Sequence, residues 1–525
     1  MAAVVQPGSI RPAASAPAAA APRRLRVGLY ADSPLQPRWV LEAFGRLAGT
    51  GFAALAAVAL GEAPRPAEPL LARAYGGLDR WKFGSDLSEP VDLALLGLPL
   101  GQGAAHLERR ELDVVFALGA VDDAALDGIA RCGVWRFRAD GKSEVLSGEP
   151  LSASGLSVRL AAGAVPRLAY QSWSRTYPLS VARNRRELLE KTAEFPARAL
   201  RELQRSGREW LEQCLPCPEQ KDVVSNSLVS LGKRIVERGL QKATSVEQWS
   251  LAFRFGPSRA VAGDLKGFTH IDSPAGATWA DPFPLQRNGR YYVYFEEIPR
   301  GAAKGHISML EVRPDGTWSA PARVLERDYH LSYPFLLEHE GGLLMIPETA
   351  QNRTVEAWRC VEFPLKWRFE RVLLDGMRCV DATLTRSGDR WWMFANSGET
   401  RCLDDELHIF HAADPLGRGD GGWRAHQRNP VKSDVRSARP AGAMFWRDGA
   451  LHRPAQICAP LYGSGISVNR VQRLSLSEYA EREAQRILPA GRAGLTGRHN
   501  LFGIHTLNRA GELTVVDAFT RQRRI

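Results

Sequence analysis

The sequence predicts two folded domains and a link between them: an α/β Rossmann-like domain at residues 25–180, a helical connector at residues 181–247, and an all-β five-bladed β-propeller at residues 248–520. Three observations lead to this prediction. Short apolar runs alternate with helix-length spacers in the first third of the chain, charged residues with helical periodicity follow, and hairpin-like units recur through the second half. A length of 525 residues is enough for two to four domains.

Composition and charge exclude several classes of protein. Hydrophobic residues make up 44% of the chain and charged residues 24%, which is typical of a globular protein and not of a disordered chain, collagen or a coiled coil. The formal net charge is +11, but four arginines lie in residues 1–26 and three in the last five residues, and neither tail carries an acid. The remaining body is close to neutral, so we expect no nucleic-acid partner.

The N-terminus and the cysteines bear on location. Residues 1–24 are rich in Ala and Pro and lack the basic and apolar regions of a signal peptide, so we expect a disordered leader. No run of about 18–20 uncharged apolar residues is present, so we expect no transmembrane segment. Seven scattered cysteines favour reduced thiols and a cytoplasmic protein. The pair Cys214-Leu-Pro-Cys217 lacks two further ligands, and we expect neither a metal nor a cofactor.

The first domain is expected to contain a parallel sheet. Its apolar runs are continuous rather than alternating, which is typical of parallel strands covered by helices on both faces. The expected strands are Leu25–Tyr30, Phe52–Ala59, Val91–Leu98, Val114–Leu118 and Val134–Phe137. A helix is expected from Pro37 to Leu47. In the connector, Leu and Ala recur at helical spacing between charged residues, and Pro196 should kink or split that helix.

Five similar units follow residue 248. Each has an apolar strand, a tight turn with glycine and a second apolar or aromatic strand, which is the pattern of a β-hairpin. The turn glycines are Gly289, Gly342, Gly388, Gly449 and Gly511. Further strands such as His306–Val312 lie between the hairpins, and four strands in each of five periods predict a five-bladed propeller. We expect Gln248–Phe253 to pair with the last unit and close the ring.

The innermost strands of a propeller line its central channel, so polar residues that begin the first strand of each unit should converge. These residues are Asp281, Tyr333, Asp381, Arg439 and His505. Carboxyl groups gathered in one channel mouth fit acid and base chemistry on a glycosidic bond. The alternative is that Asp281 and Asp381 bond turn amides and only hold the strand ends.

Motifs in these units resemble a known family. Ala280-Asp-Pro-Phe, Ser332-Tyr-Pro-Phe with Ile346-Pro-Glu-Thr, Val380-Asp-Ala-Thr-Leu and Leu451-His-Arg-Pro-Ala-Gln look like the N-terminal domain of glucosamine inositolphosphorylceramide transferases, over about residues 248–520. That domain is similar in architecture to the five-bladed furanosidase glycoside hydrolases. In the plant enzymes the transferase activity is assigned to a separate C-terminal domain. This chain stops at Ile525, so the resemblance does not lead us to expect that activity here.

The furanosidase-like resemblance implies roles for the carboxylates. It matches Asp281 to the base or nucleophile and Asp381 to the residue that orients the substrate or tunes the acid. The acid is normally a Glu from the fourth blade, but the matching residues 438–445 contain no carboxylate. Glu348 is the best replacement acid; the alternative is a surface Glu at a strand end.

Four further residues complete the candidate site as substrate-binding groups. His505 could also donate a proton, or it could be a satisfied buried His. Arg439 and Arg453 could hold a carboxylate or a phosphate through a bidentate fork, or they could cross-link blades instead. Tyr333 is the remaining substrate-binding candidate.

The first domain carries a second resemblance. Leu112-Asp-Val-Val-Phe-Ala-Leu-Gly followed by Cys132-Gly-Val-Trp-Arg-Phe-Arg is similar to the fold of methionyl-tRNA formyltransferases. That family requires an Asn, a His and an Asp. Here Arg138 stands about where the His belongs, and residues 116–121 contain no Asn. A guanidinium does not release its proton at neutral pH, so we expect a formyltransferase-like domain without formyl transfer.

Three classes of function remain open. The first is a carbohydrate-active enzyme, related to glycosidases or glycosyltransferases, that acts on a glycan or glycoconjugate in surface polysaccharide or glycolipid assembly. Its partner would be a glycan, a nucleotide-sugar or a glycolipid substrate. The second is a non-catalytic sugar-binding scaffold, and the third is a formyl or acyl transferase for an amino sugar. The sequence does not predict the oligomeric state.

Overall fold

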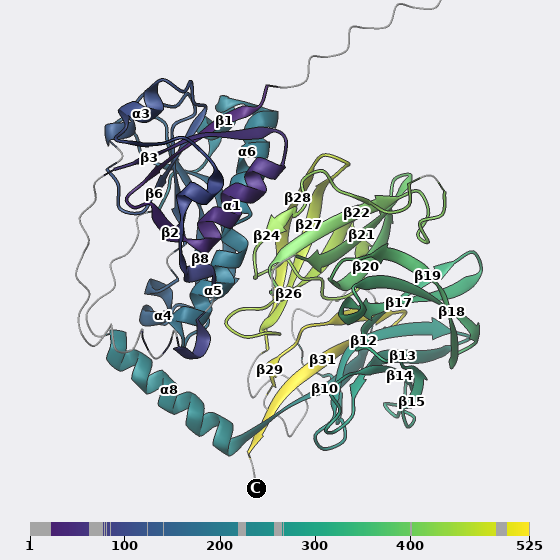
Figure 1. Cartoon of the computed structure of the whole chain (residues 1–525). Helices are drawn as coiled ribbons and strands as arrows, with labels where there is room; N and C mark the ends of the chain where they lie inside the picture. The colour runs from purple at the N-terminus through teal and green to yellow at the C-terminus, as the bar shows by residue number, and fades with distance from the viewer. Residues whose placement is uncertain are drawn as a thin grey trace, which may run out of the picture.

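The computed structural model describes residues 23–61, 77, 79, 81–84, 86–122, 124–139, 141–218, 227–256, 265, 267–398, 402–419, 421–489 and 501–523. They form an α/β lobe and an all-β lobe that lie side by side (Figure 1). Apart from its last two residues, the expected leader at residues 1–24 lies outside the described residues.

The front domain is built on a seven-stranded sheet with the order β5-β3-β1-β6-β7-β8-β9. Its strands are β1 (Leu25–Ala31), β3 (Ala53–Leu60), β5 (Leu100–Gln102), β6 (Val114–Leu118), β7 (Val134–Arg138), β8 (Leu151–Arg159) and β9 (Arg167–Arg175). The first five are mutually parallel, but β8 pairs antiparallel with both β7 and β9. The expected strands that form in this sheet are thus parallel, but the sheet as a whole is mixed and not the parallel sheet that was predicted. Burial on both faces produces continuous apolar runs whichever way a strand points, so the pattern does not report direction.

One expected strand is also absent. Residues 91–98 form the short strand β4 (Pro90–Asp92) and a 3-10 turn, η2 (Leu93–Leu96), instead of a strand of the main sheet. β4 pairs with β2 (Leu35–Pro37), next to the start of α1 (Arg38–Gly49). The Asp92 side chain accepts a hydrogen bond from the Ala94 backbone and so turns the chain out of the extended conformation.

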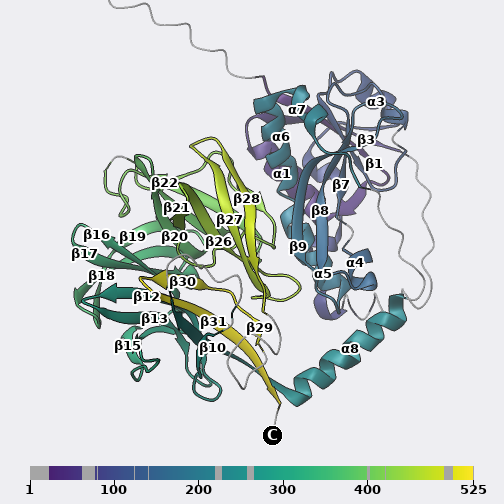
Figure 2. The same cartoon turned by 180° about the vertical axis from the view of Figure 1, so that it is seen from behind.

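Helices cover both faces of the front sheet. On one face, α1, α5 (Val181–Thr192), α6 (Phe195–Ser206) and α7 (Arg208–Gln213) share one apolar core with the strands. The other face carries the one-turn helix α3 (Ala105–Glu108). Pro196 lies in the first turn of α6, where its missing N–H costs nothing, so the helix is split before it. α4 (Ser143–Ser147) precedes β8, and α8 (Ser227–Thr244) leads to the second lobe (Figures 1 and 2).

The second lobe is a five-bladed propeller. Blade 1 is β12–β15 (Thr278–Arg287, Arg290–Ile298, His306–Val312, Ala322–Leu325), blade 2 is β16–β19 (Ser332–His339, Gly342–Thr349, Thr354–Glu362, Lys366–Asp375), blade 3 is β20–β24 (Cys379–Ser387, Arg390–Ser397, Glu406–Ala412, Arg424–Ala425, Lys432–Ser433) and blade 4 is β25–β28 (Phe445–Arg447, Ala450–Ile457, Gly465–Leu474, Tyr479–Ile487). Blade 5 combines β10 (Ser245–Phe255) and β11 (Thr269–Ile271) with β29 (Leu501–Gly503), β30 (Leu507–Ala510) and β31 (Leu513–Arg523). The predicted five-bladed propeller is confirmed.

Blade 5 closes the ring. β10 pairs antiparallel with β31 through eleven residue pairs, from Ser245 opposite Arg523 to Phe255 opposite Leu513. Strands from the two ends of the propeller segment thus share one sheet, as expected for Gln248–Phe253. The pairing covers an edge of β31 that would otherwise be free.

We predict that a chain beginning at residue 244 folds and melts cooperatively, because the propeller has its own apolar core. A chain beginning at residue 256 lacks β10 and should aggregate, because the long edge of β31 is then unpaired. Thermal melting and size-exclusion chromatography of the two truncations compare them directly. Equal solubility would contradict the role assigned to β10.

Candidate functional site

Three inner strands carry the same irregularity at the residues that the sequence singled out. The pairing register jumps between Ala280 and Phe283 in β12, and it does so again at the matching places in β16 and β20. The bulged residues Asp281, Tyr333 and Asp381 have φ values of +52°, +42° and +56°. Residues other than glycine rarely adopt this left-handed conformation, and such strain is concentrated at functional sites. A bulge also redirects the side chain that it carries.

Asp281 is held by a histidine and a second aspartate. The Nε2 atom of His505 lies 3.1 Å from Oδ1 of Asp281, and its Nδ1 lies 3.1 Å from Oδ2 of Asp517. The Thr506 hydroxyl also donates to Asp281, at 2.6 Å. Asp517 accepts the backbone N–H groups of His505 and Thr506, at 2.7 and 3.1 Å. An imidazole between two buried carboxylates therefore fixes the position of Asp281.

Asp381 is held by an arginine. Nε of Arg439 donates to Oδ2 of Asp381 at 2.6 Å, and its Nη1 donates to Asp404 at 2.9 Å. Gln456 also donates to Asp381, at 2.8 Å. The Arg439 Nη2 atom lies 3.9 Å from Oε2 of Glu348. Arg439 thus joins three carboxyl groups from different parts of the propeller.

These groups carry distinct proton affinities. Burial and the nearby charge of Asp381 raise the pKa of Glu348 to about 8, so Glu348 holds a proton at neutral pH. Burial alone would raise the pKa of Asp281, but the charge and hydrogen bond of His505 lower it below its ordinary value. Burial opposes the charge on His505, yet Asp517 and Asp281 raise its pKa to about 9. The site therefore pairs an ionised carboxylate with a protonated one.

The structure brings together five of the seven candidate residues. Charge interactions link Asp281, Asp381, Glu348, Arg439 and His505 in one buried cluster. Tyr333 lies in the inner strand of blade 2, but its hydroxyl already accepts from the Gly442 backbone and bonds Thr383.

Arg453 lies apart from the cluster, inside blade 4. Its guanidinium forms a two-pronged ion pair with Glu481, at 2.9 and 2.6 Å, and donates to the backbone oxygens of Ser437 and Ala438. Those two residues precede Arg439 in the chain. Arg453 therefore supports the backbone from which Arg439 reaches the cluster.

Sequence reasoning missed a second set of polar residues. Glu296, Glu348 and Asn396 lie opposite the residues that precede Asp281, Tyr333 and Asp381. Gln456 lies within β26 of blade 4, and Asp517 lies within β31 of blade 5. Of this set only Glu348 was predicted. For Glu296, Glu348, Asn396 and Asp517 the signal was a polar residue directly after an apolar run. Gln456 lacks this signal, because His452 and Arg453 interrupt its strand.

Two groups of described residues have the spacing of a metal site: His339, Glu340 and Asp414 near the surface, and a buried group in the cluster. Ligand atoms of Asp281, His505 and Asp517 lie within 4.8 Å of one another. Both His505 nitrogens face carboxylates, and its pKa of about 9 keeps the ring protonated at neutral pH. A protonated imidazole offers no lone pair to a cation, so metal binding here would require loss of that proton.

Comparisons with known proteins agree with the resemblance of the repeats. Residues 268–517 match the family model described as "Glucosamine inositolphosphorylceramide transferase 1, N-terminal". The propeller therefore resembles that N-terminal domain. The chain is 31% identical over 207 residues to glucosamine inositolphosphorylceramide transferase 1 of Oryza sativa subsp. japonica, covering 38% of this chain and 27% of that protein. It is also 31% identical over 259 residues to the Arabidopsis thaliana protein of the same name, covering 48% and 33%. The chain thus spans a third or less of the length of these relatives.

Solved structures add similar folds at low overlap. A family 117 glycoside hydrolase of Zobellia galactanivorans, Zg3597, has 13% identity and a TM-score of 0.33, covering 52% of this chain and 90% of that one. The catalytic domain of a Coprinopsis cinerea GH62 α-L-arabinofuranosidase has 12% identity and a TM-score of 0.34, covering 53% and 97%. At such overlap the propeller assignment rests on the strand pairing of this chain itself. Among the described helices, none is both long and apolar enough to cross a bilayer.

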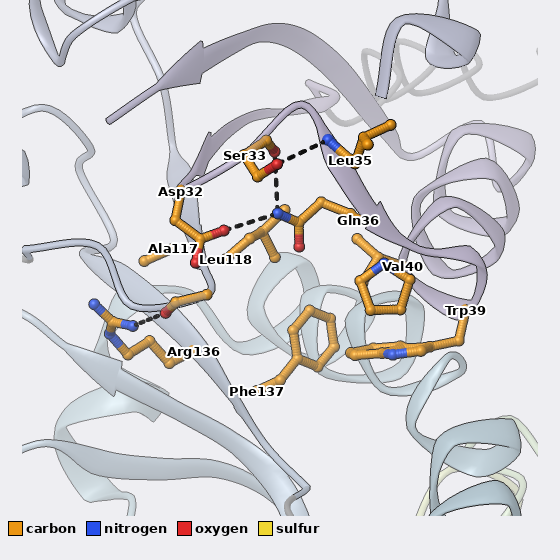
Figure 3. Close-up of a pocket in the computed structure, with 12 residues that line it drawn as sticks. Asp32, Ser33, Leu35, Gln36, Trp39, Val40, Ala117, Leu118, Arg136 and Phe137 are labelled. Atoms are coloured by element: carbon orange, nitrogen blue, oxygen red, sulfur yellow. Dashed lines mark hydrogen bonds between the residues drawn. The ribbon is translucent and has the colours of Figure 1, made fainter. Parts of the chain in front are cut away.

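A separate cavity of about 560 Å³ lies in the front domain, where β1, β6 and β7 end (Figure 3). The side chains of Trp39, Val40 and Phe137 line one side and those of Asp32 and Gln36 another. The Asp32 carboxylate accepts from the Gln36 side chain and from the Ala120 backbone, both at 3.0 Å. The carboxyl ends of neighbouring parallel strands are the usual place for a ligand in such sheets.

We predict that Arg453→Met lowers the free energy of unfolding by about 1.5–3 kcal/mol, because the buried Glu481 carboxylate loses its hydrogen bonds to Arg453 and keeps Lys432 as its remaining cation. Urea unfolding measures the change, and Arg470→Met, at an exposed position of β27, is the control. Unchanged stability together with lost glycan binding would restore Arg453 as a substrate-binding residue.

Proposed function

We propose that this protein acts on or binds a glycan or glycoconjugate in surface polysaccharide or glycolipid assembly, with its site in the mouth of the propeller. The observation that carries the proposal is the buried cluster in which an ionised Asp281 accompanies a protonated Glu348 around Arg439. The relatives that match the propeller are named for a phosphate-containing lipid, inositolphosphorylceramide, and for the amino sugar glucosamine. A glycan, a nucleotide-sugar or a glycolipid is the corresponding substrate.

In the catalytic form of the proposal, each carboxyl group has its own task. Cleavage of a glycosidic bond requires a proton for the leaving oxygen and a carboxylate on the other side of the anomeric carbon. Glu348 supplies the proton, since its pKa of about 8 keeps it protonated at pH 7. Asp281, ionised beside His505, serves as base or nucleophile. Asp381 and Arg439 orient the sugar or tune the acid. The same groups would serve hydrolysis or glycosyl transfer.

The second candidate is a sugar-binding scaffold without turnover. The same cluster would then hold hydroxyl groups through its carboxylates and Arg439. Asp281 distinguishes the two forms, because a binding site tolerates loss of one charge better than a catalytic site does.

We expect Asp281→Asn to abolish turnover of a glycan while the chain still folds. Asn retains the shape and tolerates the left-handed φ of +52°, but it supplies no negative charge to the reacting carbon. Turnover is measured on a nitrophenyl glycoside that the wild-type chain cleaves, alongside the melting temperature. Asp315→Asn, in an exposed turn of blade 1, is the matched control.

Normal turnover with lowered stability in Asp281→Asn would show that this aspartate only holds the strand end. The loss of one buried hydrogen-bonding partner would then lower stability by about 1–3 kcal/mol.

Glu348→Gln should change the dependence of stability on pH. The folded pKa of Glu348, about 8, lies above its ordinary value of 4.5, so the folded chain binds this proton more tightly and loses stability as pH rises from about 4.5 to about 8. Gln does not titrate, so the variant should lose less stability over that range. Urea unfolding at pH 5 and pH 8 measures the difference, and Glu326→Gln, at an exposed residue, is the control. An equal pH dependence in wild type and Glu348→Gln would show that Glu348 is not protonated at neutral pH.

For the front domain, the proposal is a formyltransferase-like fold that has lost formyl transfer. Its cavity is the reason to retain the third candidate function, an acyl or formyl transferase for an amino sugar. Neither a histidine nor an asparagine is among the residues that line it. Arg138, expected near the position of the essential His, donates to the Cys217 sulfur and the Pro218 oxygen. The cytoplasmic location also remains a prediction from the seven cysteines.

A further inference from the structure

The front domain is docked on the propeller through its edge strand β9 (Figure 2). The Val435 backbone N–H donates to the Trp173 oxygen at 3.0 Å, and the hydroxyls of Ser172 and Ser433 lie 2.7 Å apart. The propeller therefore extends the hydrogen bonding of the sheet edge. β9 ends at Arg175, on the side of the propeller that holds the carboxyl cluster.

Two buried ion pairs fix this contact. Lys191 and Asp405 lie 2.7 Å apart with side chains only 2% exposed, and Ser174 of β9 donates to the same carboxylate at 2.7 Å. Arg198 forms a two-pronged pair with Glu406, at 2.5 and 3.1 Å. Separating such pairs leaves buried charges without partners, which is costly. The chain around residues 404–406 is therefore held in a fixed place relative to β9.

Asp404 lies between two arginines, one from each domain. Its Oδ1 accepts from Nη1 of Arg439 at 2.9 Å, and its Oδ2 lies 3.6 Å from Nη2 of Arg175. Arg439 also bonds Asp381 and lies 3.9 Å from Glu348. Two residues, Asp404 and Arg439, therefore connect Arg175 to the candidate acid Glu348.

The two arginines differ in the number of hydrogen bonds that they donate and in their exposure. Arg439 donates through Nε and both Nη atoms, and 14% of its side chain is exposed. The Arg175 guanidinium lies 5.5 Å from the centre of the Tyr177 ring, its 3.6 Å separation from Asp404 exceeds a hydrogen bond, and 23% of its side chain is exposed. A guanidinium has five N–H donors in a planar fork. Among the described residues, Arg175 therefore retains donors for a further acceptor at the rim of the cluster.

We propose that the two domains form one composite site in which Arg175 binds an oxyanion, a phosphate ester or a carboxylate, carried by the sugar ligand. The inference deepens the proposed function and rests on it. A guanidinium fork matches both oxyanions through paired hydrogen bonds. Asp404, the carboxylate beside Arg175, is already paired with Arg439 at 2.9 Å. The ligand thus places its sugar over the propeller cluster and its anion against the front domain.

The test uses the full chain with inorganic phosphate, glucose 1-phosphate, glucuronate and glucose as probes, each titrated by calorimetry or NMR. Arg175→Gln should weaken binding of the anionic probes about tenfold or more, as for a lost hydrogen bond to a charged group, and leave glucose unchanged. Arg183→Gln is the matched control, because Arg183 lies 4.2 Å over the same Tyr177 ring but has no contact with Asp404. Arg175→Lys keeps the charge without the fork and should give an intermediate loss for glucose 1-phosphate.

The comparison of probes identifies the anion. A loss confined to the phosphates indicates phosphate-ester recognition, and a parallel loss for glucuronate indicates a general oxyanion site. Anionic probes that bind wild type and Arg175→Gln equally well, or fail to bind wild type, overturn the inference, as does an equal loss for glucose. Turnover that survives Asp281→Asn removes the proposed acid–base function alone, so the two failures are distinguishable. Melting curves of Arg175→Gln and Arg183→Gln confirm that both variants fold.

Discussion

The pairing of β10 with β31 is the constraint on which the rest of the propeller depends. It joins the two ends of the segment through eleven residue pairs and makes the fifth sheet a shared one. β31 carries Asp517, so closure brings that carboxylate to Asp281, whose backbone N–H lies 3.3 Å from it. β10 carries Trp249, whose ring lies 4.4 Å from the His505 ring. The strand that closes the ring thus also packs against the histidine of the site.

The cluster at the centre follows from a balance of buried charge. Burying a carboxylate is costly unless a cation accompanies it. Arg439 pairs with Asp381 and Asp404, and His505 pairs with Asp281 and Asp517. Glu348 remains 3.9 Å from the nearest guanidinium nitrogen, and its Oε2 has no hydrogen-bond partner among the described residues. The carboxyl group left over is therefore the one that keeps its proton. Glu348 lacks a closely paired cation, which makes it costly to ionise. For the same reason it is suitable as an acid.

The features that could be predicted from the sequence are those that repeat along the chain. Five hairpins with glycine turns implied five blades, and equivalent positions in a ring converge by symmetry, which is why Asp281, Asp381, Arg439 and His505 could be grouped in advance. Strand direction in the front domain was not encoded in this way, since β8 is buried like its parallel neighbours. Asp404 and Arg175 could not be placed either. Their positions depend on how two domains dock, and no periodicity in the chain reports that contact.

Docking of the domains gives partners to polar groups that each domain would otherwise expose. The edge strand of an open sheet presents unpaired backbone groups, and here the propeller covers β9 with a backbone hydrogen bond and a serine contact. The propeller in turn has Asp405 and Glu406 on a blade surface, and Lys191 and Arg198 of the front-domain helices neutralise them. Asp404 precedes these residues directly, so the contact that shields both domains also sets the carboxylate that Arg439 and Arg175 share. The arrangement of charge around Arg439 is therefore a property of the two-domain chain.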